Sequence, residues 1–588
     1  VRSKTSQTTR MFVFISLAWL LFVLVIDPSN GESSTSSSST SSSHPNIVLL
    51  LADNLGYNDI SLFGAPTAQT PNLDRLGWEG IKLNNWNSAA HLCSASRAAI
   101  LTGKYPAKMG IYPRVFKVDA VYGMLPEETT VAEYLKPHNY STSIVGKWHL
   151  GHRPEYLPTQ QGFDDWMGIP YHMSGGSVDG HECYHPSHHS DQGDSQQETM
   201  WLPLYHNDQI IQQPVQLSDL AKRYATHATN FLEQQHHNQN PFFLFVSFSH
   251  VHQLCAPKFG GNEQQTCQWA SKPSSSSSTD IPTFVDAVQE MDWIAGQILD
   301  KLDQLNFTNN TLVLFTSDNG PWVAEQECAG SKGPFEGRWL QQNVPMNCTA
   351  CPSDFVPDSN VFRQCRLPST NQTVTGIHCG IDSGLGSLWE ANLRMPAIAR
   401  WPGKIKPHTE SMEMLSSLDI VPTILSILNI PIPKNIDGID VSSVLFQNNQ
   451  ASSTDTPVTN DRVLFFWRDG FREGPLPQPY GRFDVAAVKV GRIKAWLWTK
   501  SGHYNDDEEV YHDPPLLFDV LSDPAEAFPL DPSHHEDLIK RIAELVREHK
   551  ASTPPTFPLA LWSDPQFLPC VNRETNCRTS TTIEEAIQ

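Results

Sequence analysis

The chain has 588 residues, of which 39% are hydrophobic, and its formal net charge is -22 at pH 7. That length allows at least one large core and roughly two to four domains. The acidic balance and the lack of any basic run argue against nucleic acid as a partner, and they favour a soluble protein.

The first residues have the layout of a secretory signal. Lys4 and Arg10 precede an uncharged, mostly apolar run at residues 12–26, which ends in a polar Asp-Pro-Ser-Asn-Gly stretch. Met11 is a plausible start, and a membrane anchor is the alternative, although the run is short for a span. We predict a leader and signal peptide at 1–31, a Ser-rich linker at 32–44 and no membrane span in the mature chain. The protein is then expected on the secretory route, either secreted or lysosomal.

Two further patterns fit that route. Five Asn-x-Ser/Thr sites predict glycosylation at Asn139, Asn306, Asn309, Asn347 and Asn371. The chain has eleven cysteines, an odd number, and five of them fall within residues 328–379. We interpret this segment as a disulfide-stapled insertion, because an oxidising compartment pairs thiols. The pairing itself cannot be deduced from the sequence.

Strands and helices alternate along the first 450 residues. Apolar runs predict strands at 46–52, 141–145, 242–248, 311–316 and 396–401, and helical patterns fall at 71–80, 131–135, 217–234 and 284–305. This order predicts an α/β fold with a large, mostly parallel sheet flanked by helices. Beyond residue 461 the apolar runs are shorter, and 536–550 has the pattern of an amphipathic helix. We therefore predict a main domain at 45–450 and a smaller C-terminal α+β domain and tail at 451–588.

Chemically useful side chains follow four of the predicted strands. Asp53-Asn54 and Asp318-Asn319 end two of them, and the other two lead into Lys147 and His149 and into His252. Ligands bind at the carboxyl ends of strands in such sheets. The oxygen donors suit a hard cation such as Ca²⁺, although Asp and Asn also end strands as ordinary turn residues. Lys147 and His149, two residues apart, would point the same way in extended backbone.

A cysteine and an arginine add an anion site and a nucleophile. In the run His91-Leu-Cys-Ser-Ala-Ser-Arg97, Cys93 and Arg97 are one helical turn apart at the start of an apolar helical run. A helix N-terminus and a guanidinium both favour anions. An anion pocket beside a nucleophile and a divalent cation suits the transfer of a sulfate or phosphate group.

The sequence resembles the type I sulfatases over nearly all of residues 45–577. The resemblance is carried by NIVLLLADNLGYND at 46–59, CSASRAAILTGKY at 93–105, GKWHLG at 146–151 and TSDNGP at 316–321, with SLDIVPT at 417–423. NDQIIQQP at 207–214 and HDPPLLFDV at 512–520 are similar to the branch of arylsulfatase A and steroid sulfatase. Residues 168–206 are polar and His-rich, so the membrane hairpin of steroid sulfatases is not expected. Within this stretch we interpret the His-rich loop at 172–189 as solvated, with opportunistic metal binding as the alternative.

This resemblance implies an alkaline-phosphatase-like sulfatase fold and a mechanism. The family's motif cysteine, here Cys93, is oxidised to formylglycine by a formylglycine-generating enzyme during biosynthesis, which would leave ten thiols for five bridges. The implied roles are support of position 93 by Arg97, triggering of sulfate release by His149, and contacts of Lys147 and His252 with the sulfate and leaving group. The implied Ca²⁺ ligands are Asp53, Asn54, Asp318, Asn319 and position 93.

The chain departs from the family pattern at four places. Asn54 replaces a usual Asp, Ala95 replaces a usual Pro, Lys104 replaces a usual Arg, and Leu385 falls where the family has a lysine. Lys332 is the lysine that could fill the gap left at Leu385. We expect a sulfatase acting on a sulfated small molecule or glycan. The alternatives are a catalytically impaired glycoprotein that binds sulfated glycans or serves in extracellular matrix, and a phosphoester hydrolase of related fold. The oligomeric state is not determined by the sequence.

Overall fold

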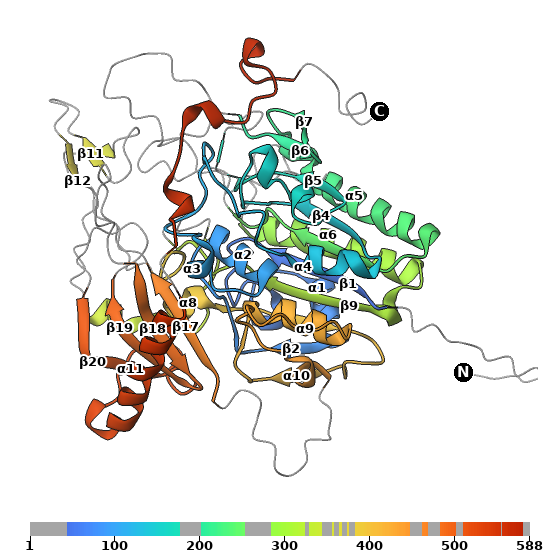
Figure 1. Cartoon of the computed structure of the whole chain (residues 1–588). Helices are drawn as coiled ribbons and strands as arrows, with labels where there is room; N and C mark the ends of the chain where they lie inside the picture. The colour runs from blue at the N-terminus through green and yellow to red at the C-terminus, as the bar shows by residue number, and fades with distance from the viewer. Residues whose placement is uncertain are drawn as a thin grey trace, which may run out of the picture. The chain divides into compact units, whose positions relative to one another are not determined.

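The computed structural model describes residues 44–173, 175–176, 201–252, 284–323, 329–343, 356–357, 364–366, 373–375, 383–446, 461–468, 483–500, 510–553 and 556–579 (Figure 1). The predicted signal peptide, nearly all of the Ser-rich linker and most of the cysteine-rich insertion lie outside these ranges. No helix among the described residues is long and apolar enough to cross a membrane.

A large sheet forms the centre of the described structure (Figure 1). Its strand order is β15-β2-β14-β9-β1-β8-β4-β5-β6-β7. The middle five strands are parallel: β9 (Thr311–Ser317), β1 (Asn46–Ala52), β8 (Phe242–Ser247), β4 (Ser141–Gly146) and β5 (Asp165–Gly168). The flanks contain antiparallel pairs, with β15 (Thr409–Ser411), β2 (Ile81–Leu83) and β14 (Ile398–Arg400) on one side and β6 (Leu204–His206) and β7 (Gln209–Gln212) on the other.

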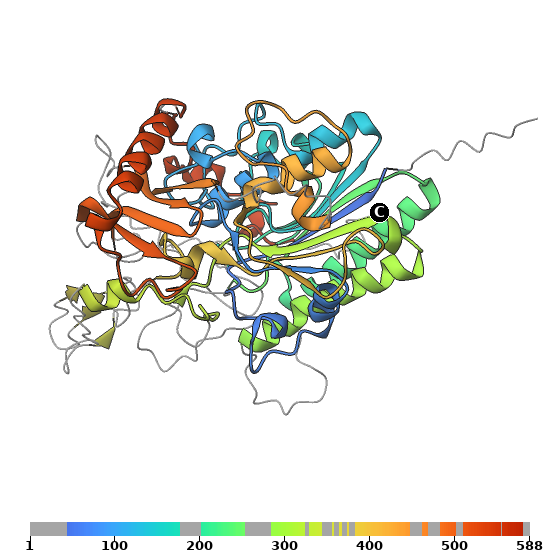
Figure 2. The same ribbon diagram turned by 90° about the horizontal axis from the view of Figure 1, so that it is seen from below.

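Both faces of this sheet are covered by helices, as its continuous apolar strands require. Leu49 and Leu51 of β1 pack on one face and Val48 and Leu50 on the other, so the side chains alternate between two cores. The first core includes α2 (Cys93–Thr102), α4 (Val131–Leu135) and α9 (Ile420–Ile427), and the second includes α1 (Pro71–Trp78), α5 (Leu217–Asn238) and α6 (Phe284–Gln304). In Figure 2 the green helices α5 and α6 lie on the opposite side of the sheet from the orange helix α9.

Shorter elements complete the main domain. They are the helices α3 (Pro106–Met109), α7 (Arg338–Asn343), α8 (Glu390–Leu393) and α10 (Ser442–Phe446), one small sheet of β13 (Arg394–Met395), β3 (Trp86–Asn87) and β16 (Leu415–Ser416), and another of β10 (Val356–Pro357), β11 (Gln364–Arg366) and β12 (Thr373–Thr375). The last sheet and α7 both belong to the described part of the predicted insertion.

The smaller C-terminal domain is an antiparallel sheet with one long helix. Its strands are β17 (Val463–Arg468), β18 (Asp484–Val490), β19 (Ile493–Thr499) and β20 (Val510–Asp519), and α11 (Glu536–Ala551) packs on β18. The other face presents Trp496, which lies 4.1 Å from Trp389 of the main domain between ring centroids. The predicted α/β fold with a smaller α+β domain is confirmed; the exact domain limits stay a prediction.

A buried group of charges joins the two sheets. Glu390 of α8 is fully buried and pairs with Lys489 of β18 at 2.9 Å, Lys494 of β19 at 3.2 Å and Arg394 at 2.7 Å. Glu526 completes the group, since Lys494 lies 3.2 Å from its carboxylate. We call these five residues the interdomain cluster. Because its members come from both domains, it fixes the C-terminal sheet against α8.

The final described segment, residues 556–579, returns to the main domain instead of extending the C-terminal sheet (red in Figure 1). Leu559 N–H donates to Gly110 O at 2.9 Å, and Asp564 N–H donates to Asp119 O at 2.9 Å. A disulfide between Cys570 and Cys577 closes a short loop in this segment. The tail therefore lies along the same domain that holds the candidate site.

Candidate active site

The ends of β1, β8 and β9 meet at one edge of the sheet. Asp53 follows β1, and its N–H donates to His250 O beyond β8 at 2.7 Å. Asn54 has a φ of 61°, a left-handed conformation that Asn tolerates better than most residues, and its N–H donates to Asp318 Oδ1 at 3.2 Å. The predicted convergence of Asp53, Asn54, Asp318 and Asn319 is therefore present, and all four are buried.

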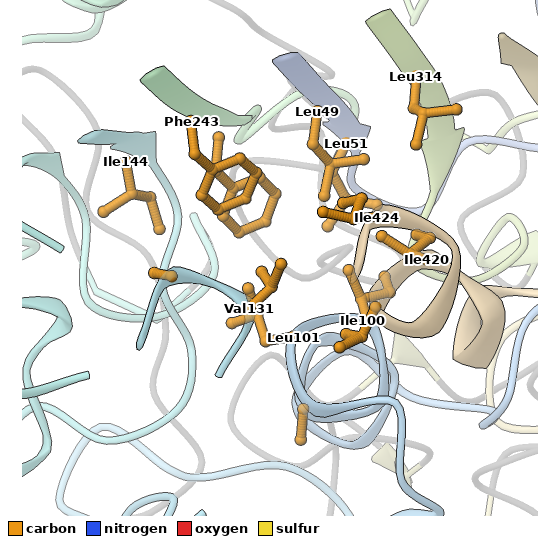
Figure 3. Packing of buried hydrophobic residues seen from close by; sticks show 14 of the residues in the cluster. Leu49, Leu51, Ile100, Leu101, Val131, Ile144, Phe243, Leu314, Ile420 and Ile424 are labelled. Carbon is orange, nitrogen blue, oxygen red and sulfur yellow. The ribbon is translucent and has the colours of Figure 1, made fainter. Parts of the chain in front are cut away.

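Helix α2 brings Cys93 to the same edge. The helix begins at Cys93 and ends at Gly103, whose φ of 71° and contact with Ile436 suit a residue without a Cβ. The C-terminal part of α2 is fixed by the hydrophobic core, because Ile100 and Leu101 pack with Leu49 and Leu51 of β1 (Figure 3). The first turn of α2 is thus held rigidly against the strand ends.

The Cys93 thiol lies between two oxygens. Its Sγ is 3.7 Å from Asp53 Oδ1 and 3.7 Å from Asn54 Oδ1, and it forms no disulfide. Arg97, one turn further along α2, donates from Nε to Asp318 Oδ2 at 3.0 Å and from Nη1 to Lys147 O at 3.1 Å. The predicted Cys/Arg pair therefore shares one helix face and one group of buried side chains with Asp53 and Asp318.

Lys147 and His149 reach the site through an irregular turn rather than a strand. Strand β4 ends at Gly146, where an added Cβ would lie 1.9 Å from Ser247 O, and His149 has a φ of 62°. The expected extended backbone, in which both side chains would point the same way, is therefore wrong. Lys147 Nζ instead forms an ion pair with Asp53 Oδ2 at 2.7 Å.

The imidazole of His149 has a defined hydrogen-bonding state. Its Nε2 lies 3.1 Å from Phe116 O, and since a carbonyl only accepts, Nε2 carries the proton. Phe116 is tied to α2 because its N–H donates to Ser94 Oγ at 3.1 Å. Nδ1 is buried without a hydrogen-bond partner among the described residues. A neutral His149 therefore offers Nδ1 as a proton acceptor.

His252 is accompanied by a histidine that the sequence patterns did not single out. The ring of His172 stacks on that of His252, with centroids 4.8 Å apart and an interplanar angle of 11°, and it lies 5.2 Å from the ring of His149. The sequence treated His172 as part of a solvated His-rich loop, most of which lies outside the described residues. The usable signal was its place four residues beyond the end of β5, another parallel strand.

Burial controls the protonation of the site. It raises the pKa of the Cys93 thiol above its usual range, opposed by the Lys147 cation, so the unmodified thiol is a poor nucleophile at neutral pH. Burial also raises the pKa of Asp318, opposed by Arg97 and reinforced by Asp53. For His149, burial and then the charge of Lys147 lower the pKa well below its ordinary value, which keeps the ring neutral.

The donor set fits a hard cation. One atom each from Asp53, Cys93 and Asp318 lie within 4.8 Å of one another. Asn319 Nδ2 donates to Asn54 Oδ1 at 2.7 Å, while Asn319 Oδ1 is buried with no hydrogen-bond partner among the described residues. A divalent cation would use that oxygen and relieve the repulsion between the two carboxylates, as expected for oxygen-coordinated Ca²⁺.

The other departures from the motif have clear places. Ala95 is buried in the core on α2, and Lys104 pairs with Glu128 at 2.7 Å. Leu385 is 4% exposed, and its N–H donates to Pro321 O at 2.9 Å, just beyond Asp318-Asn319-Gly320. Lys332 Nζ donates to Ser383 Oγ at 3.1 Å, two residues before Leu385. Lys332 therefore reaches the segment where the family's lysine is missing.

The glycosylation sites divide by position. Asn139, Asn306 and Asn309 are exposed, as carriers of a glycan must be, whereas Asn347 and Asn371 lie outside the described residues.

Comparison with known proteins agrees with this geometry. A model of the Sulfatase family matches residues 45–430, and one described as the C-terminal region of aryl-sulfatase matches residues 459–579. The chain belongs to the sulfatase family. Arylsulfatase G of Rattus norvegicus is 33% identical to this sulfatase over 556 residues, covering 91% of this chain and 92% of the relative. Arylsulfatase A of Homo sapiens is 31% identical over 499 residues, covering 83% of each chain.

Solved structures show the same fold. The PsFucS1 sulfatase from a Pseudoalteromonas species has a TM-score of 0.62 and 23% identity, covering 88% of this chain and 92% of that one. The structure of Ps i-CgsB with k-i-k-neocarrahexaose has a TM-score of 0.60 and 21% identity, covering 91% and 96%. The resemblance to type I sulfatases of the arylsulfatase A branch is thus confirmed. This sulfatase is a sulfuric ester hydrolase of arylsulfatase type, and the relatives do not favour the non-catalytic alternative.

Proposed function

We propose that this sulfatase hydrolyses its sulfate ester through a formylglycine formed at Cys93, with Ca²⁺ bound by Asp53, Asn54, Asp318, Asn319 and position 93. The observation that carries the proposal is the placement of Cys93. It is buried and unpaired at the first turn of α2, with Sγ 3.7 Å from both Asp53 Oδ1 and Asn54 Oδ1, and Arg97 follows one turn later.

Each partner of the reaction has a residue suited to it. One hydroxyl of a hydrated formylglycine would attack sulfur, and the ester's S–O bond breaks as the alcohol leaves. The other hydroxyl would then lose its proton and re-form the aldehyde, which breaks the C–O bond to the bound sulfate and releases it. Ca²⁺ supplies a fixed positive charge for the sulfate oxygens. His149 takes the proton on Nδ1, the nitrogen that has no described protein partner, while its bond from Nε2 to Phe116 O fixes the ring.

Arg97 and Lys147 hold the site in shape as well as lending charge. Arg97 is 1% exposed and binds Asp318, and Lys147 is fully buried and binds Asp53. Arg97 and Lys147 therefore each fix one carboxylate oxygen, Oδ2 of Asp318 and Oδ2 of Asp53 respectively, and we assign the Oδ1 atoms to the metal. His252, stacked on His172, stands at the neighbouring strand end, where it can meet the leaving group.

Lys332 supplies the cation that Leu385 lacks. A lysine in this corner stabilises negative charge that develops in the transition state, and its loss would raise the barrier by about 3 kcal/mol. Lys332 reaches Ser383, two residues from Leu385, on the segment held to Pro321 O. Lys332 thus takes the role of the family's lysine from a different part of the chain.

The remaining features suit a secretory hydrolase of a sulfated small molecule or glycan. The exposed Asn139, Asn306 and Asn309 are available for glycans, and the signal-like leader directs the chain to the compartment where cysteines are converted. These features support a location outside the cell or in the lysosome.

The test is hydrolysis of p-nitrophenyl sulfate by the purified full chain and by Cys93→Ala. The native protein should release nitrophenol, and the variant should lose at least about 10³-fold in kcat/KM with its unfolding free energy within about 1 kcal/mol. Circular dichroism and thermal unfolding of the same Cys93→Ala variant separate loss of chemistry from loss of fold. Undiminished activity in Cys93→Ala would refute the proposed nucleophile.

A further inference from the structure

A second group of metal-binding side chains lies away from the candidate active site. Asp165 begins β5, His206 ends β6 and His227 lies in the middle of α5. One ligand atom from each of the three falls within a 4.8 Å group. Figure 1 shows β5, β6 and the green helix α5 close together.

The position of this group separates it from the sulfate chemistry. The active-site residues follow the carboxyl ends of the parallel strands, whereas Asp165 is the first residue of β5 and therefore lies at the opposite, amino edge. Its neighbour across the strand pair is Ser143 of β4, whose hydroxyl donates to Asp165 Oδ2 at 2.8 Å. The hydroxyl orients the carboxylate as an outer-shell partner would.

Both imidazoles approach that carboxylate with the same nitrogen. His227 Nε2 is 2.6 Å from Asp165 Oδ2, and His206 Nε2 is 3.4 Å from Asp165 Oδ1. The two rings are nearly perpendicular, at 77°, with centroids 5.6 Å apart. Two Nε2 atoms and a carboxylate are the donor types that bind Zn²⁺ in proteins, with a solvent molecule in the fourth position.

Charge and exposure also suit a transition-metal ion. Within the described part of the chain, the partners of Asp165 are imidazoles and a hydroxyl, with no lysine or arginine ion pair. The side chains are 20–31% exposed, which leaves a path for an ion from solvent.

We propose that Asp165, His206 and His227 form a Zn²⁺ site that clamps α5 to β5 and β6. Tetrahedral ligands of zinc stand about 3.3 Å apart, given bonds of about 2.0 Å. The 3.4 Å contact of His206 with Oδ1 matches that spacing, whereas the 2.6 Å contact of His227 is with the other oxygen, Oδ2. One oxygen of Asp165 and the two ring nitrogens nevertheless lie within 4.8 Å of one another, so binding requires the His227 ring to move away from Oδ2. The ion would join residues 165, 206 and 227, which belong to three separate elements, and so stabilise this edge of the sheet.

The experiment is titration of the chelator-stripped full chain with ZnCl₂, followed by calorimetry, in excess Ca²⁺ to occupy the active site. We expect one equivalent to bind at roughly micromolar zinc. His227→Gln and His206→Gln should each weaken that binding at least about 100-fold. The control His237→Gln, an exposed histidine in the same helix, should leave it unchanged. Substituted Co²⁺ should give the strong visible absorption of a tetrahedral site, and His227→Gln should lose it.

Asp165→Asn provides a second variant that keeps the shape of the side chain if a histidine variant folds poorly. It should also lose the zinc equivalent and the visible Co²⁺ absorption. Absence of zinc binding to the native chain would overturn the proposal. So would binding that persists unchanged in His227→Gln and Asp165→Asn, because the ion would then be held by the active site or by histidines elsewhere.

Discussion

Two buried groups of charge can be compared directly in this molecule. The interdomain cluster around Glu390 binds each carboxylate to cations or hydrogen-bond donors, and both Glu390 oxygens are occupied. The active-site group around Asp53 and Asp318 has two matching cations but leaves Asn319 Oδ1 and His149 Nδ1 without hydrogen-bond partners among the described residues. Unpaired buried polar atoms cost free energy, which supports the proposal that Asn319 Oδ1 binds an ion and that His149 Nδ1 accepts a proton.

The pKa values of the two carboxyls Glu390 and Asp318 shift in opposite directions. Burial pushes the pKa of Glu390 upward, but Lys489, Lys494 and Arg394 outweigh it and hold that pKa well below its usual value. At Asp318 burial has the larger effect, so the pKa of this carboxyl is raised although Arg97 acts to lower it. Within the interdomain cluster, however, burial lowers the pKa of Lys489 to about 7 and raises the pKa of Glu526. The contrast therefore applies to the carboxyls of Glu390 and Asp318 and not to every group around them.

The largest expected effect is a loss of stability when a charge is removed from the interdomain cluster. Glu390→Gln removes the negative charge that Lys489, Lys494 and Arg394 share, and leaves buried cations with too little compensation. The unfolding free energy should fall by about 3–5 kcal/mol, measured by urea unfolding. The control Glu536→Gln, on the exposed start of α11, should change it by less than about 0.5 kcal/mol. Equal effects of the two substitutions would mean that the interdomain cluster contributes no special stability.

The next effect should come from the candidate active site and appear in the rate of sulfate hydrolysis instead of the free energy of unfolding. Lys332→Ala should lower kcat/KM for aryl sulfates about 100-fold, because the cation near Leu385 is lost. Leu385→Lys in the native background should do little. Lys404→Ala, at an exposed site, is the control. If Leu385→Lys raised the rate on alkyl sulfates while Lys332→Ala had no effect, the corner would lack a cation in the native protein.

A single imidazole sharpens the comparison further. His152 lies three residues beyond His149 and is held by a hydrogen bond, in which its Nε2–H donates to Phe567 O at 2.9 Å. Burial lowers its pKa from 6.5 to about 4. The unfolded chain therefore binds more protons than the folded chain between those values, and stability is lost as the pH falls through that window.

From pH 8 to pH 5 the contribution of His152 amounts to about 2 kcal/mol. His152→Gln keeps an N–H donor for Phe567 O and does not titrate, so its unfolding free energy should decline less on acidification by about that amount. Thermal unfolding of both proteins at several pH values measures the difference. Parallel pH profiles would show that His152 does not remain neutral in the folded state.

The smallest expected effect concerns the metal. Asn54→Asp adds a negative charge to the donor set, and Nδ2 of Asn54 has no described partner to lose. Asn319 Nδ2 could still donate to the new carboxylate. Calorimetry should find Ca²⁺ bound about tenfold more tightly, or about 1.4 kcal/mol. Unchanged or weaker binding would remove residue 54 from the ligand set.

The sequence predicted those parts of the site that follow from regular strands. Asp53 and Asp318 stand one residue or so beyond buried apolar runs, so parallel pairing was enough to bring them together. The turn after β4 was not predictable in this way, because the left-handed backbone at His149 breaks the alternation of a strand. His172 was missed for a similar reason, since its neighbours in sequence suggested a solvated loop.

Contacts between distant segments were also beyond the reach of sequence patterns. Asp165 and His227 are brought together only by the packing of α5 on the sheet, and no motif spacing links them. The contact of Lys332 with Ser383 depends on tertiary packing, because residue 331 beside it is held by a bond from Ser331 N–H to Asp59 Oδ1 at 2.6 Å. The return of the tail, through bonds such as Leu559 N–H to Gly110 O, follows from tertiary packing in the same way.

The most direct measurement for the central claim is peptide mass spectrometry of residue 93 in protein purified from its native source. The Cys93 thiol is buried, unpaired and a poor nucleophile while its pKa remains raised, so the account requires a converted side chain. Formylglycine at position 93 is the predicted result. An unmodified thiol throughout the active preparation, or Cys93 in a disulfide, would contradict the account.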